Sequence, residues 1–582
     1  MENDEKLHGM RHALAHLTVA AVRSFYPHAQ NAIGPAIDNG FYQDFDMGDT
    51  KLSEDDLPKI QAKMIELLKD WVAFERREVT LDEALKEFAW NIYKTELIKE
   101  FSSESKTLTF YTCGGFVDLC KGGHSDNPAK DIPTDSFKLD RIAGAYWRGD
   151  EKNKMLTRIY GLAFENKDML DAYILMQEEA RKRDHRKIGR DMDLFTFSDL
   201  VGSGMPLFTP KGNVVREEII KFSRDLNNEL GFGEVHTPNI NKAELFKISG
   251  HYDKYKEDML SVSSQYVNEE MFLKPMNCPQ HTQIYASQPR SYRDLPIRYS
   301  DFSMLYRDEK PGELVGLTRL RGFSQDDGHI FCREDQIESE ISNVLSAIKK
   351  ALDTYAISYW MRLSLRDPNN TEKYLGSDEV WEKSQNIMRA LLEEKNIPFK
   401  PAEGEAAFYG PKVDVMAVDA IGREWQISTI QLDFNQPSRF GLEYTGQDGT
   451  KHTPVMIHRA LIGSPDRFLG ILAEHYAGLF PVWLSPVQVA IVPVRNETHG
   501  EFANKILAQL KEKNIRVEIS NNDDSLGKRI NSAKAQKVPY VIVIGDKEME
   551  SGNLTIETRS EKIQITIDEF VEKISLEIKN RS

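Results

Sequence analysis

One stretch of the chain gathers cations, acids and an aromatic ring: FSMLYRDEKPGELVGLTRLRGFSQDDGHIF, residues 302–331. Arg307 and Arg319 could bind phosphate oxygens through their planar guanidinium groups, and Phe323 could stack on a base. Glu309 places a carboxylate beside them. A salt-bridged surface hairpin would have a similar composition. The stretch therefore predicts either a hairpin that binds a phosphorylated, aromatic ligand or a charged hairpin without a ligand.

A second group of reactive residues lies near the N-terminus. His12 and His16 are four residues apart, so they share one face of a helix. The string CKGGH adds Cys120 and His124. Three imidazoles and one thiol form a plausible metal-binding set by residue type. Because HxxxH spacing is common by chance, two partly buried helix histidines without a ligand remain an alternative.

The bulk composition fits a globular protein of several domains. At roughly 100–200 residues per domain, 582 residues predict about three to five domains. The formal net charge of −16 argues against indiscriminate nucleic-acid binding, but a selective RNA partner needs only a basic docking face. Four cysteines argue against a disulfide scaffold and favour a reduced, cytoplasmic setting. The sequence has neither an apolar signal core nor a membrane span.

Residues 1–167, the elements that must position the N-terminal histidines, are predicted to form a compact α+β domain. Apolar residues at helical spacing predict helices at 8–30, 54–72 and 81–100. Short strand-like runs and Gly-rich turns occupy 107–165.

Residues 168–191 are predicted to form a basic linker helix. Positions 180–190 carry six Arg or Lys against one Asp. Charge runs of this kind are usually solvated, yet cations on one strut could also contact phosphates. Both a solvated connector and a phosphate-contacting strut stay open.

Residues 192–480 are predicted to form an antiparallel sheet with packed helices, since no regular βαβ repeat is present. GxGxxG and Walker A sequences are absent, so a nucleotide would have to bind by another route. Beyond FPVWLSP, residues 481–582 hold the β-branched runs VQVAIVPV and VPYVIVIG, which are typical of strands buried on both faces of a small α/β domain. The expected strands are 358–365, 412–418 and 424–434, and the expected helices are 213–230, 335–353, 499–514 and 525–536.

Three motifs of the chain resemble those of the class II aminoacyl-tRNA synthetases. YRDE, a loop and RGF, within 302–331, resemble motif 2. GFGEVHTP resembles motif 1, whose proline, here Pro238, lies at the family's dimer interface. HRALIGSPDRFLGIL resembles motif 3, with Arg467 as its arginine. Three motifs in the family's order and spacing argue strongly against chance agreement.

Further strings, among them KPMNCPQH, QDDGHIF, VMIHRALIGS, FYGPKVD and QLDF, resemble the threonyl-tRNA synthetases within this class. The resemblance implies a multidomain α+β and α/β fold: an N-terminal α+β editing domain, a class II antiparallel-sheet catalytic core and a C-terminal α/β anticodon-binding domain. It also implies ATP-dependent attachment of L-threonine to tRNA(Thr) through a threonyl-adenylate. A cytoplasmic homodimer without a membrane partner is expected.

The resemblance further implies Mg²⁺ with ATP and one Zn²⁺ per subunit, held by Cys278, His329 and His458. Taken singly, each of these could be a core thiol or a hydrogen-bonded core histidine. Together, a thiolate and two imidazoles suit Zn²⁺ and leave its coordination open. Threonine could then bind through its amino and hydroxyl groups, whereas valine lacks the hydroxyl and should be rejected.

The same resemblance implies roles for single residues. Arg307 would bridge the threonine carboxylate and the α-phosphate, and Arg467 would bind the terminal phosphates. His251 and Lys412 would lie near the terminal ribose of the tRNA, where His251 could assist deprotonation of the 2′-hydroxyl. The implied ATP contacts are Arg307, Glu309, Arg319, Phe323, Gln426, Ser464 and Arg467. The implied amino-acid contacts are Gln325, Asp327, Tyr409 and Gln431.

Serine also carries the hydroxyl, and one missing methyl group gives only about 1–3 kcal/mol of discrimination. A second, hydrolytic site is therefore expected. HALAHL, IGPAIDNGFYQDF and DLCKGGH resemble the editing domain of bacterial-type threonyl-tRNA synthetases. The resemblance implies that seryl-tRNA is hydrolysed there without a metal. The implied residues are His12, His16, Lys94, Asp118, Cys120 and His124.

Several positions depart from the family pattern. Only about seven residues precede HGMRHALAHL, so the ubiquitin-like domain of most bacterial relatives is expected to be lacking. Gln43 stands where relatives often have a second tyrosine, and CKGGH replaces the commoner CRGPH. Glu557 stands where relatives often carry an arginine used on the anticodon. We expect altered editing efficiency and altered anticodon contacts.

Two rival interpretations have distinct signatures. Another class IIa synthetase would not need the Cys278, His329 and His458 set, because few members have a zinc amino-acid pocket. A regulatory or RNA-binding relative without catalysis would be expected to have lost Arg307, Arg467 or a zinc ligand, and all are present.

Overall fold

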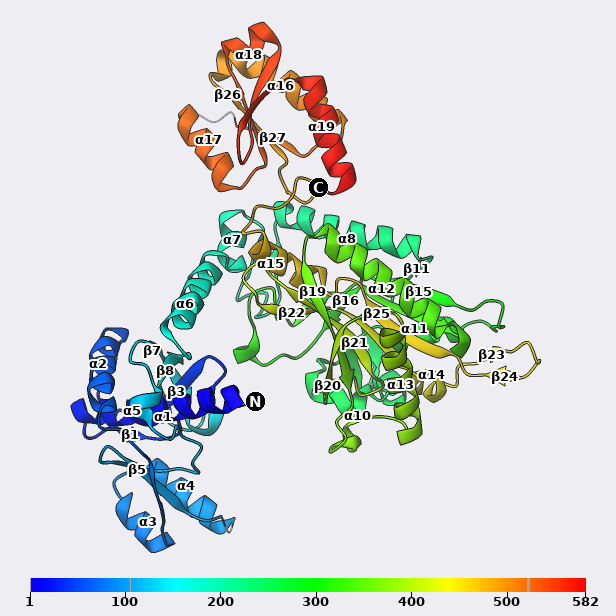
Figure 1. Ribbon diagram of the computed structural model, residues 1–582. Helices are drawn as coiled ribbons and strands as arrows, with labels where there is room; N and C mark the ends of the chain where they lie inside the picture. The colour runs from blue at the N-terminus through cyan, green and yellow to red at the C-terminus, as the bar shows by residue number, and fades with distance from the viewer. Residues whose placement is uncertain (1, 105, 521–523) are drawn as a thin grey trace. The chain divides into compact units, whose positions relative to one another are not determined.

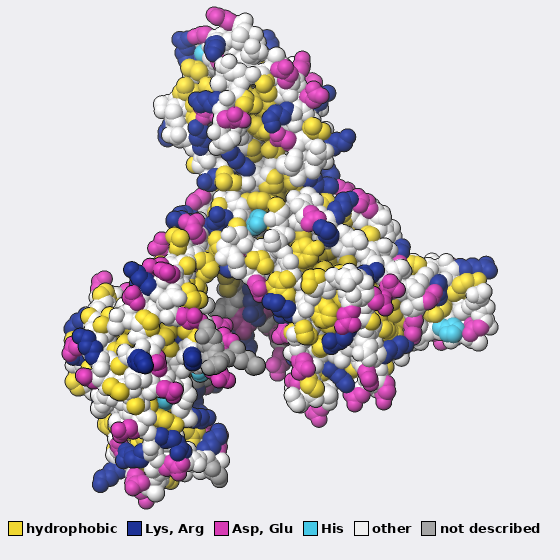
Figure 2. Space-filling model, viewed as in Figure 1, with side chains coloured by type: hydrophobic (Ala, Val, Ile, Leu, Met, Phe, Trp, Pro, Cys, Tyr) yellow, Lys and Arg dark blue, Asp and Glu magenta, His cyan; other side chains and the backbone are white. Residues whose placement is uncertain are grey.

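The computed structural model describes residues 2–104, 106–520 and 524–582 (Figure 1). The chain divides into two compact units, Met1–Glu178 and Glu179–Ser582. In the described part of the chain, no helix is both long enough and apolar enough to cross a membrane. On the face that Figure 2 shows, basic and acidic side chains are interspersed.

The first unit is built on a long helix, α1 (Glu2–Phe25), which packs against a five-stranded antiparallel sheet. Leu14 of this helix is fully buried with Phe41 and Phe45 of the sheet. The strand order is β1–β3–β8–β7, with β2 paired to β3. The strands are β1 (Gln30–Asn31), β2 (Ala36–Ile37), β3 (Gly40–Asp46), β7 (Phe137–Tyr146) and β8 (Met155–Ala163), and helices α2 (Leu57–Leu68) and α5 (Pro128–Asp131) complete this layer.

A smaller sheet with two helices follows in the same unit. The single helix predicted at 81–100 is wrong, because α3 (Leu81–Glu87) and α4 (Ile92–Ser103) are separate. Asn91 explains the break: its side chain accepts hydrogen bonds from the N–H groups of Tyr93 and Lys94 and so begins a new helix. The strands are β4 (Glu75–Glu78), β5 (Thr109–Cys113) and β6 (Phe116–Leu119).

The basic linker is also two helices where one was predicted. Helix α6 (Lys167–Lys182) ends before Arg183, and α7 (His185–Asp191) begins after Asp184. The Asp184 carboxylate accepts a 2.8 Å hydrogen bond from the Arg186 N–H, which caps α7. The cap makes His185 the first residue of a helix within the second unit.

An eight-stranded sheet forms the centre of the second unit, as predicted for a class II core, and it is antiparallel except at its two edge pairs. Ile330, Ile430 and Ile457 are fully buried in its core. The strand order is β11 (Gly233–Glu234), β15 (Ile297–Asp301), β18 (Asp327–Cys332), β25 (Val455–Ala460), β22 (Glu424–Asp433), β21 (Lys412–Val418), β19 (Ser358–Leu365) and β20 (Phe399–Glu403). Its packed helices are α8 (Pro210–Glu229), α12 (Ile337–Thr354), α13 (Asp378–Glu394) and α15 (Pro465–His475).

Shorter elements surround this sheet and carry several of the predicted site residues. The helices are α9 (Ala243–Ser249), α10 (His251–Tyr255), α11 (Cys278–Ala286) and α14 (Asn435–Arg439). The strands are β9 (Phe195–Thr196), β10 (Leu207–Phe208), β12 (Ile240–Lys242), β13 (Ser261–Val262), β14 (Met271–Leu273), β16 (Met304–Tyr306), β17 (Gly322–Ser324), β23 (Tyr444–Thr445) and β24 (Lys451–His452).

The C-terminal α/β part confirms the predicted buried strands. Val489, Ile491 and Ile542 pack on one side of its five-stranded sheet, while Val492 and Val541 pack on the other. The strand order is β27 (Val517–Ile519), β26 (Val489–Pro493), β28 (Tyr540–Ile544), β29 (Asn553–Glu557) and β30 (Lys562–Thr566). Its helices are α16 (Asn496–Glu512), α17 (Leu526–Ala535), α18 (Asp546–Ser551) and α19 (Ile567–Asn580). The predicted fold class, with mixed α+β and α/β parts around an antiparallel core, is confirmed.

Candidate functional site

Cys278, His329 and His458, which we call the central cluster, meet at one row of the eight-stranded sheet. His329 on β18 lies directly opposite His458 on β25. His458 lies opposite Gln431 on β22, and Gln431 lies opposite Lys412 on β21. Cys278 joins them from the first turn of α11, and the ligand atoms of the three lie within 4.8 Å of one another. Register between strands therefore assembles residues that are far apart in the sequence.

The outer nitrogens of both histidines are held by other side chains. His458 Nε2 lies 3.0 Å from an Asp433 carboxylate oxygen, so it carries the proton and leaves Nδ1 free. His329 Nδ1 lies 2.8 Å from His281 Nδ1. The inner nitrogens, His329 Nε2 and His458 Nδ1, face each other at 3.1 Å. Two imidazole nitrogens and a thiol thus converge on one point.

A cavity of about 420 Å³, which we call the arginine cavity, lies along the same sheet. Among the described residues, Arg307 and Arg467 each have a buried Nε without a hydrogen-bond partner. Burial, followed by the positive charge of Arg307, lowers the pKa of Arg467. The Arg307 guanidinium lies 5.2 Å from the centre of the Phe323 ring. Two residues predicted to bind the amino-acid substrate, Gln325 and Gln431, also line this cavity. All the predicted site residues that line it are Arg307, Glu309, Arg319, Phe323, Gln325, Gln426, Gln431, Ser464 and Arg467.

The hairpin predicted at 302–331 forms, with β16 antiparallel to β17. Its loop does contain an ion pair, Glu309 with Arg319 at 2.8 Å, as expected of a charged hairpin. Both residues nevertheless line the arginine cavity. The motif 3 side of the cavity is fixed by Ser464, whose hydroxyl accepts a hydrogen bond from the Arg467 N–H at the start of α15.

Three further predicted residues touch the central cluster. His251 is fully buried, with Nε2 at 3.7 Å from Cys278 Sγ. Burial lowers the pKa of His251 to about 3. The Tyr409 ring stacks on His458 with centres 4.6 Å apart, and its hydroxyl donates to Gln431. Asp327 Oδ1 lies 3.8 Å from His329 Nε2.

The reactive residues near the N-terminus also come together, and we call them the N-terminal cluster: His12, His16, Cys120 and His124, with Lys94 and Asp118. Cys120 Sγ lies 3.4 Å from His12 Nε2 and 3.2 Å from His124 Nε2. Asp118 is buried and contacts His16 Nδ1 at 3.2 Å and Lys94 Nζ at 2.7 Å. All six predicted residues are therefore neighbours.

Charge in the N-terminal cluster is already balanced. Burial opposes ionisation of Cys120, but hydrogen bonds with His12 and His124 outweigh it and lower its pKa to about 3. Burial likewise opposes the charge on His16, but Asp118 and Cys120 raise its pKa to about 9. The site thus contains a thiolate beside an imidazolium at neutral pH.

Comparisons with known proteins identify the parts of this chain. Residues 108–160 match the threonyl and alanyl tRNA synthetase second additional domain. Residues 260–476 match the tRNA synthetase class II core domain of the G, H, P, S and T enzymes, and residues 488–577 match an anticodon binding domain. A threonine–tRNA ligase of Bacteroides fragilis is 46% identical over 587 residues, covering 100% of this chain and 90% of the relative.

The chain belongs to the threonyl-tRNA synthetase family. A threonine–tRNA ligase of Thermotoga neapolitana is 44% identical over 585 residues, with the same coverage. The structure titled as the RNA binding domain of threonyl-tRNA synthetase from Cryptosporidium parvum matches 68% of this chain and 98% of its own, at 35% identity and a TM-score of 0.64. A prolyl-tRNA synthetase of Giardia lamblia, at 16% identity and a TM-score of 0.55, shares the fold.

The residue types of the central cluster fit Zn²⁺. Burial and Asp327 raise the pKa of Cys278 well above its ordinary value, while burial and His281 lower that of His329. Both groups are therefore neutral in the protein alone. A divalent cation would favour the thiolate, since the metal takes the place of the proton. The carboxylate on the outer nitrogen of His458 is the partner that zinc-binding histidines usually have.

Two residues that support the central cluster were not predicted from the sequence. Asp433 and His281 contact the two histidines of the central cluster. Both lie inside strings that carry the family resemblance, QLDF and KPMNCPQH. Their only sequence signal is proximity to predicted site residues, since His281 is three residues after Cys278 and Asp433 is two residues after Gln431.

Gln43 and Glu557, two positions that depart from the family pattern, are both buried. Gln43 is buried on β3, and a Cβ added at Gly34 would lie only 1.8 Å from its Oε1. Glu557 pairs with Lys534 at 2.6 Å and with Lys562 at 2.5 Å. A glutamate at this position thus neutralises two lysines of the anticodon-binding domain.

Proposed function

We propose that the chain attaches L-threonine to tRNA(Thr) with ATP and hydrolyses seryl-tRNA(Thr) at a separate site. The observation that carries the first activity is a cavity lined by Arg307 and Arg467, each with a buried Nε that has no hydrogen-bond partner in the described part of the chain, next to the Cys/His₂ cluster. Two neighbouring cations that have no carboxylate partner among the described residues favour an anionic ligand, so the triphosphate of ATP, with its Mg²⁺, suits the cavity.

Activation is an in-line attack of the threonine carboxylate on the α-phosphorus, which forms the acyl-phosphate bond and releases pyrophosphate. Arg307 stabilises the charge that develops on the α-phosphate oxygens, and Arg467 holds the departing phosphates. Phe323 stacks on the adenine, and Glu309 accepts a hydrogen bond from its amino group. Arg319, Gln426 and Ser464 complete the nucleotide contacts from the walls of the arginine cavity.

Selection of threonine rests on the central cluster. When bound by Cys278, His329 and His458, Zn²⁺ would supply a Lewis acid with open positions for the amino and hydroxyl groups of the amino acid. Asp327 accepts hydrogen bonds from the amino or hydroxyl group, and Gln325, Tyr409 and Gln431 orient the substrate. Valine, without a hydroxyl, leaves these polar groups unpaired.

In the second step the terminal ribose of the tRNA attacks the carbonyl carbon of the adenylate and displaces AMP. Ser249 donates to the Phe246 carbonyl, so it accepts the Nδ1 proton of His251. His251 therefore presents a proton-free Nε2 that can accept a hydrogen bond from the 2′-hydroxyl. Lys412, held by Asp414 at 2.5 Å, adds a positive charge. The assignment fails if His251→Ala leaves single-turnover transfer from preformed adenylate unchanged.

For editing, the N-terminal cluster provides charges on both sides of an ester. Lys94 and the His16 imidazolium stabilise the oxyanion that forms when water adds to the seryl carbonyl. Burial lowers the pKa of His124, so it stays neutral and accepts the proton of the attacking water. His12, Asp118 and the Cys120 thiolate hold these groups in place.

We also propose a cytoplasmic homodimer, formed through the motif 1 segment that contains Pro238. All four cysteines are free, which suits a reducing compartment. Sedimentation velocity would give the assembly state directly, and a monomer at micromolar concentration would contradict the dimer.

The deciding experiment is a charging assay with threonine, serine and valine, with and without His12→Ala. We expect threonyl-tRNA from both proteins, no valyl-tRNA, and seryl-tRNA only from the variant. Threonine-dependent pyrophosphate exchange separates the rivals: exchange with proline, glycine or histidine would indicate another class IIa synthetase, and none with any amino acid would indicate a regulator.

A further inference from the structure

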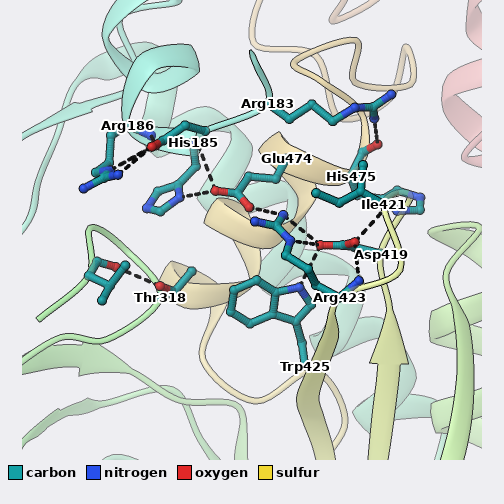
Figure 3. A network of polar contacts seen from close by, with 12 residues as sticks. Arg183, His185, Arg186, Thr318, Asp419, Ile421, Arg423, Trp425, Glu474 and His475 are labelled. Carbon is teal, nitrogen blue, oxygen red and sulfur yellow. Dashed lines mark hydrogen bonds and ion pairs between the residues drawn. The ribbon is translucent and has the colours of Figure 1, made fainter. Parts of the chain in front are cut away.

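A buried histidine outside both sites joins three segments of the second unit (Figure 3). His185, the first residue of α7, contacts Glu474 near the end of α15 with Nδ1 at 2.6 Å. Its other ring nitrogen, Nε2, accepts a 2.9 Å hydrogen bond from the backbone N–H of Leu317. The linker segment, the motif 3 helix and the motif 2 loop therefore meet at one side chain.

These contacts fix the protonation of His185. Because the Leu317 N–H can only donate, Nε2 must carry a lone pair. Nδ1 then carries the proton and donates it to the Glu474 carboxylate. Although burial opposes ionisation of Glu474, hydrogen bonds from the side chain and N–H of His185 outweigh it and lower its pKa.

Asp184, His185 and Glu474 are close enough to suggest a metal site, but their atoms are already engaged. Both ring nitrogens of His185 have partners. The Asp184 carboxylate makes three short contacts with the Arg186 side chain and a fourth with its N–H. These residues therefore join segments of one chain, and their role must lie in the elements that they hold in place.

What they hold is one wall of the arginine cavity. Leu317, Thr318 and Arg319 all line that cavity. Their turn is closely fitted to His185: a Cβ added at Gly316, whose φ is +48°, would lie 2.1 Å from His185 Nε2. A Cβ added at Gly470 of α15 would lie 3.1 Å from Leu317 Cβ and 3.5 Å from the His185 ring. Close packing leaves the turn little freedom to shift.

A second series of contacts leads from Glu474 to Trp425, which neighbours Arg467 of the cavity. The other Glu474 oxygen bonds Arg423, and Arg423 bonds Asp419 at 2.8 Å. Asp419 also accepts a 2.9 Å hydrogen bond from the Trp425 indole N–H. The Trp425 ring lies 5.9 Å from the guanidinium of Arg467. Figure 3 shows this series from His185 to Trp425.

We propose that His185 is a positioning residue for the nucleotide: it holds the motif 2 turn at Leu317 and, through Glu474, the strand that carries Trp425 beside Arg467. The inference rests on the proposed function, since it assumes that the arginine cavity binds ATP. Threonine binds at the central cluster, which His185 does not contact, so its removal should affect ATP and threonine unequally.

The test is threonine-dependent pyrophosphate exchange by the full chain, with ATP and threonine varied separately and rates normalised to titrated active sites. In His185→Asn the shorter side chain can still bond Glu474 but cannot reach the Leu317 N–H. We expect KM for ATP to rise roughly tenfold, as for loss of a buried hydrogen bond, with KM for threonine changed less than about twofold. His185→Gln can reach that N–H with its amide oxygen and should recover most of the ATP affinity.

The matched control is His499→Asn in the anticodon-binding domain. His499 is buried and makes the same kind of bridge, with Nδ1 accepting from the Arg495 N–H at 2.9 Å and Nε2 contacting Asp546 at 3.1 Å. This variant should lose stability without changing either KM. An unchanged KM for ATP in His185→Asn, equal shifts for both substrates, or the same shift in the control would overturn the proposal.

Hydrogen exchange tests the bridge even if His185→Asn does not fold. In the unaltered protein without ATP, the Leu317 amide should exchange slowly, because His185 holds it; rapid exchange there would contradict the bridge. If the unaltered protein shows no threonine-dependent exchange of pyrophosphate, the proposed function itself is wrong, which is a separate outcome.

Discussion

The N-terminal and central clusters both combine a cysteine with histidines, yet the first is ionised and the second is neutral. Around Cys120, partners lower the thiol pKa to about 3 and raise that of His16 to about 9, so the site is ionised without any ligand. Around Cys278, burial raises the thiol pKa, and burial also lowers the pKa of His329. Both clusters have buried carboxylates, but Asp118 and Cys120 raise the pKa of His16, whereas Asp327 raises the pKa of Cys278. Neighbouring charge, more than residue type, therefore distinguishes the proposed hydrolytic site from the proposed metal site.

The largest difference between the two clusters is expected when Cys278 is replaced. Cys278→Ala removes one of three ligands, so we expect bound zinc to fall from about one per chain to near zero and charging with threonine to fall at least about a thousandfold. Zinc is measured by elemental analysis and charging with labelled threonine. Hydrolysis of preformed seryl-tRNA is the internal control and should persist. Retention of stoichiometric zinc would show that the central cluster is not the metal site.

The N-terminal cluster offers the reciprocal change. Cys120→Ala should slow hydrolysis of seryl-tRNA by roughly a hundredfold, because the thiolate that orders the histidines is lost. Threonine charging and zinc content should stay the same. A matched variant, Cys113→Ala, removes a buried thiol of the same unit that lies outside the cluster. If it slows editing equally, the effect is structural.

A smaller effect is expected from Asp433, which contacts the outer nitrogen of His458. Asp433→Asn keeps a side-chain oxygen near His458 Nε2 but removes the charge, and we expect zinc affinity to fall about 10–100-fold. Competition with a chelator of known affinity measures this. Saturating zinc should restore threonine charging in this variant but not in Cys278→Ala. Failure of zinc to restore it would place the role of Asp433 elsewhere.

The smallest effect expected is a pH dependence of stability. The folded-state pKa of His16 is raised to about 9, so its contribution is complete below the ordinary histidine pKa of about 6.5 and is lost as pH rises through 9. The difference in melting temperature between the unaltered protein and His16→Asn should therefore shrink between pH 6.5 and 9.5. Calorimetry at several pH values measures it. A constant difference would mean that His16 is neutral in the folded protein.

Long, regular patterns in the sequence predicted the fold well. The strands expected at 412–418 and 424–434 match β21 and β22 within one residue, because β-branched residues mark them clearly. The helices expected at 81–100 and 168–191 are each interrupted. In both cases a single polar side chain, Asn91 or Asp184, caps a new helix, and apolar spacing does not register such a break.

Some site residues could likewise be predicted from the sequence, and others could not. His12 and His16 could be paired from their helical spacing alone. His329 and His458 could not, because they are neighbours only through the register of β18 with β25. Family resemblance supplied that pair, and it did not supply His281, Asp433 or His185. These residues act on other side chains, so no spacing rule in one sequence connects them to the substrate.

His329 and His458 are neighbours only while β18 and β25 keep their register. This register limits where the chain can accept inserted residues. The turn at 446–450 lies between β23 and β24 and could lengthen without touching the row. One residue inserted within β25, at 455–460, would instead bring Ile457 or Arg459 to the place of His458. Natural variation in this protein should therefore collect insertions at the hairpin tip and almost none a few residues further on.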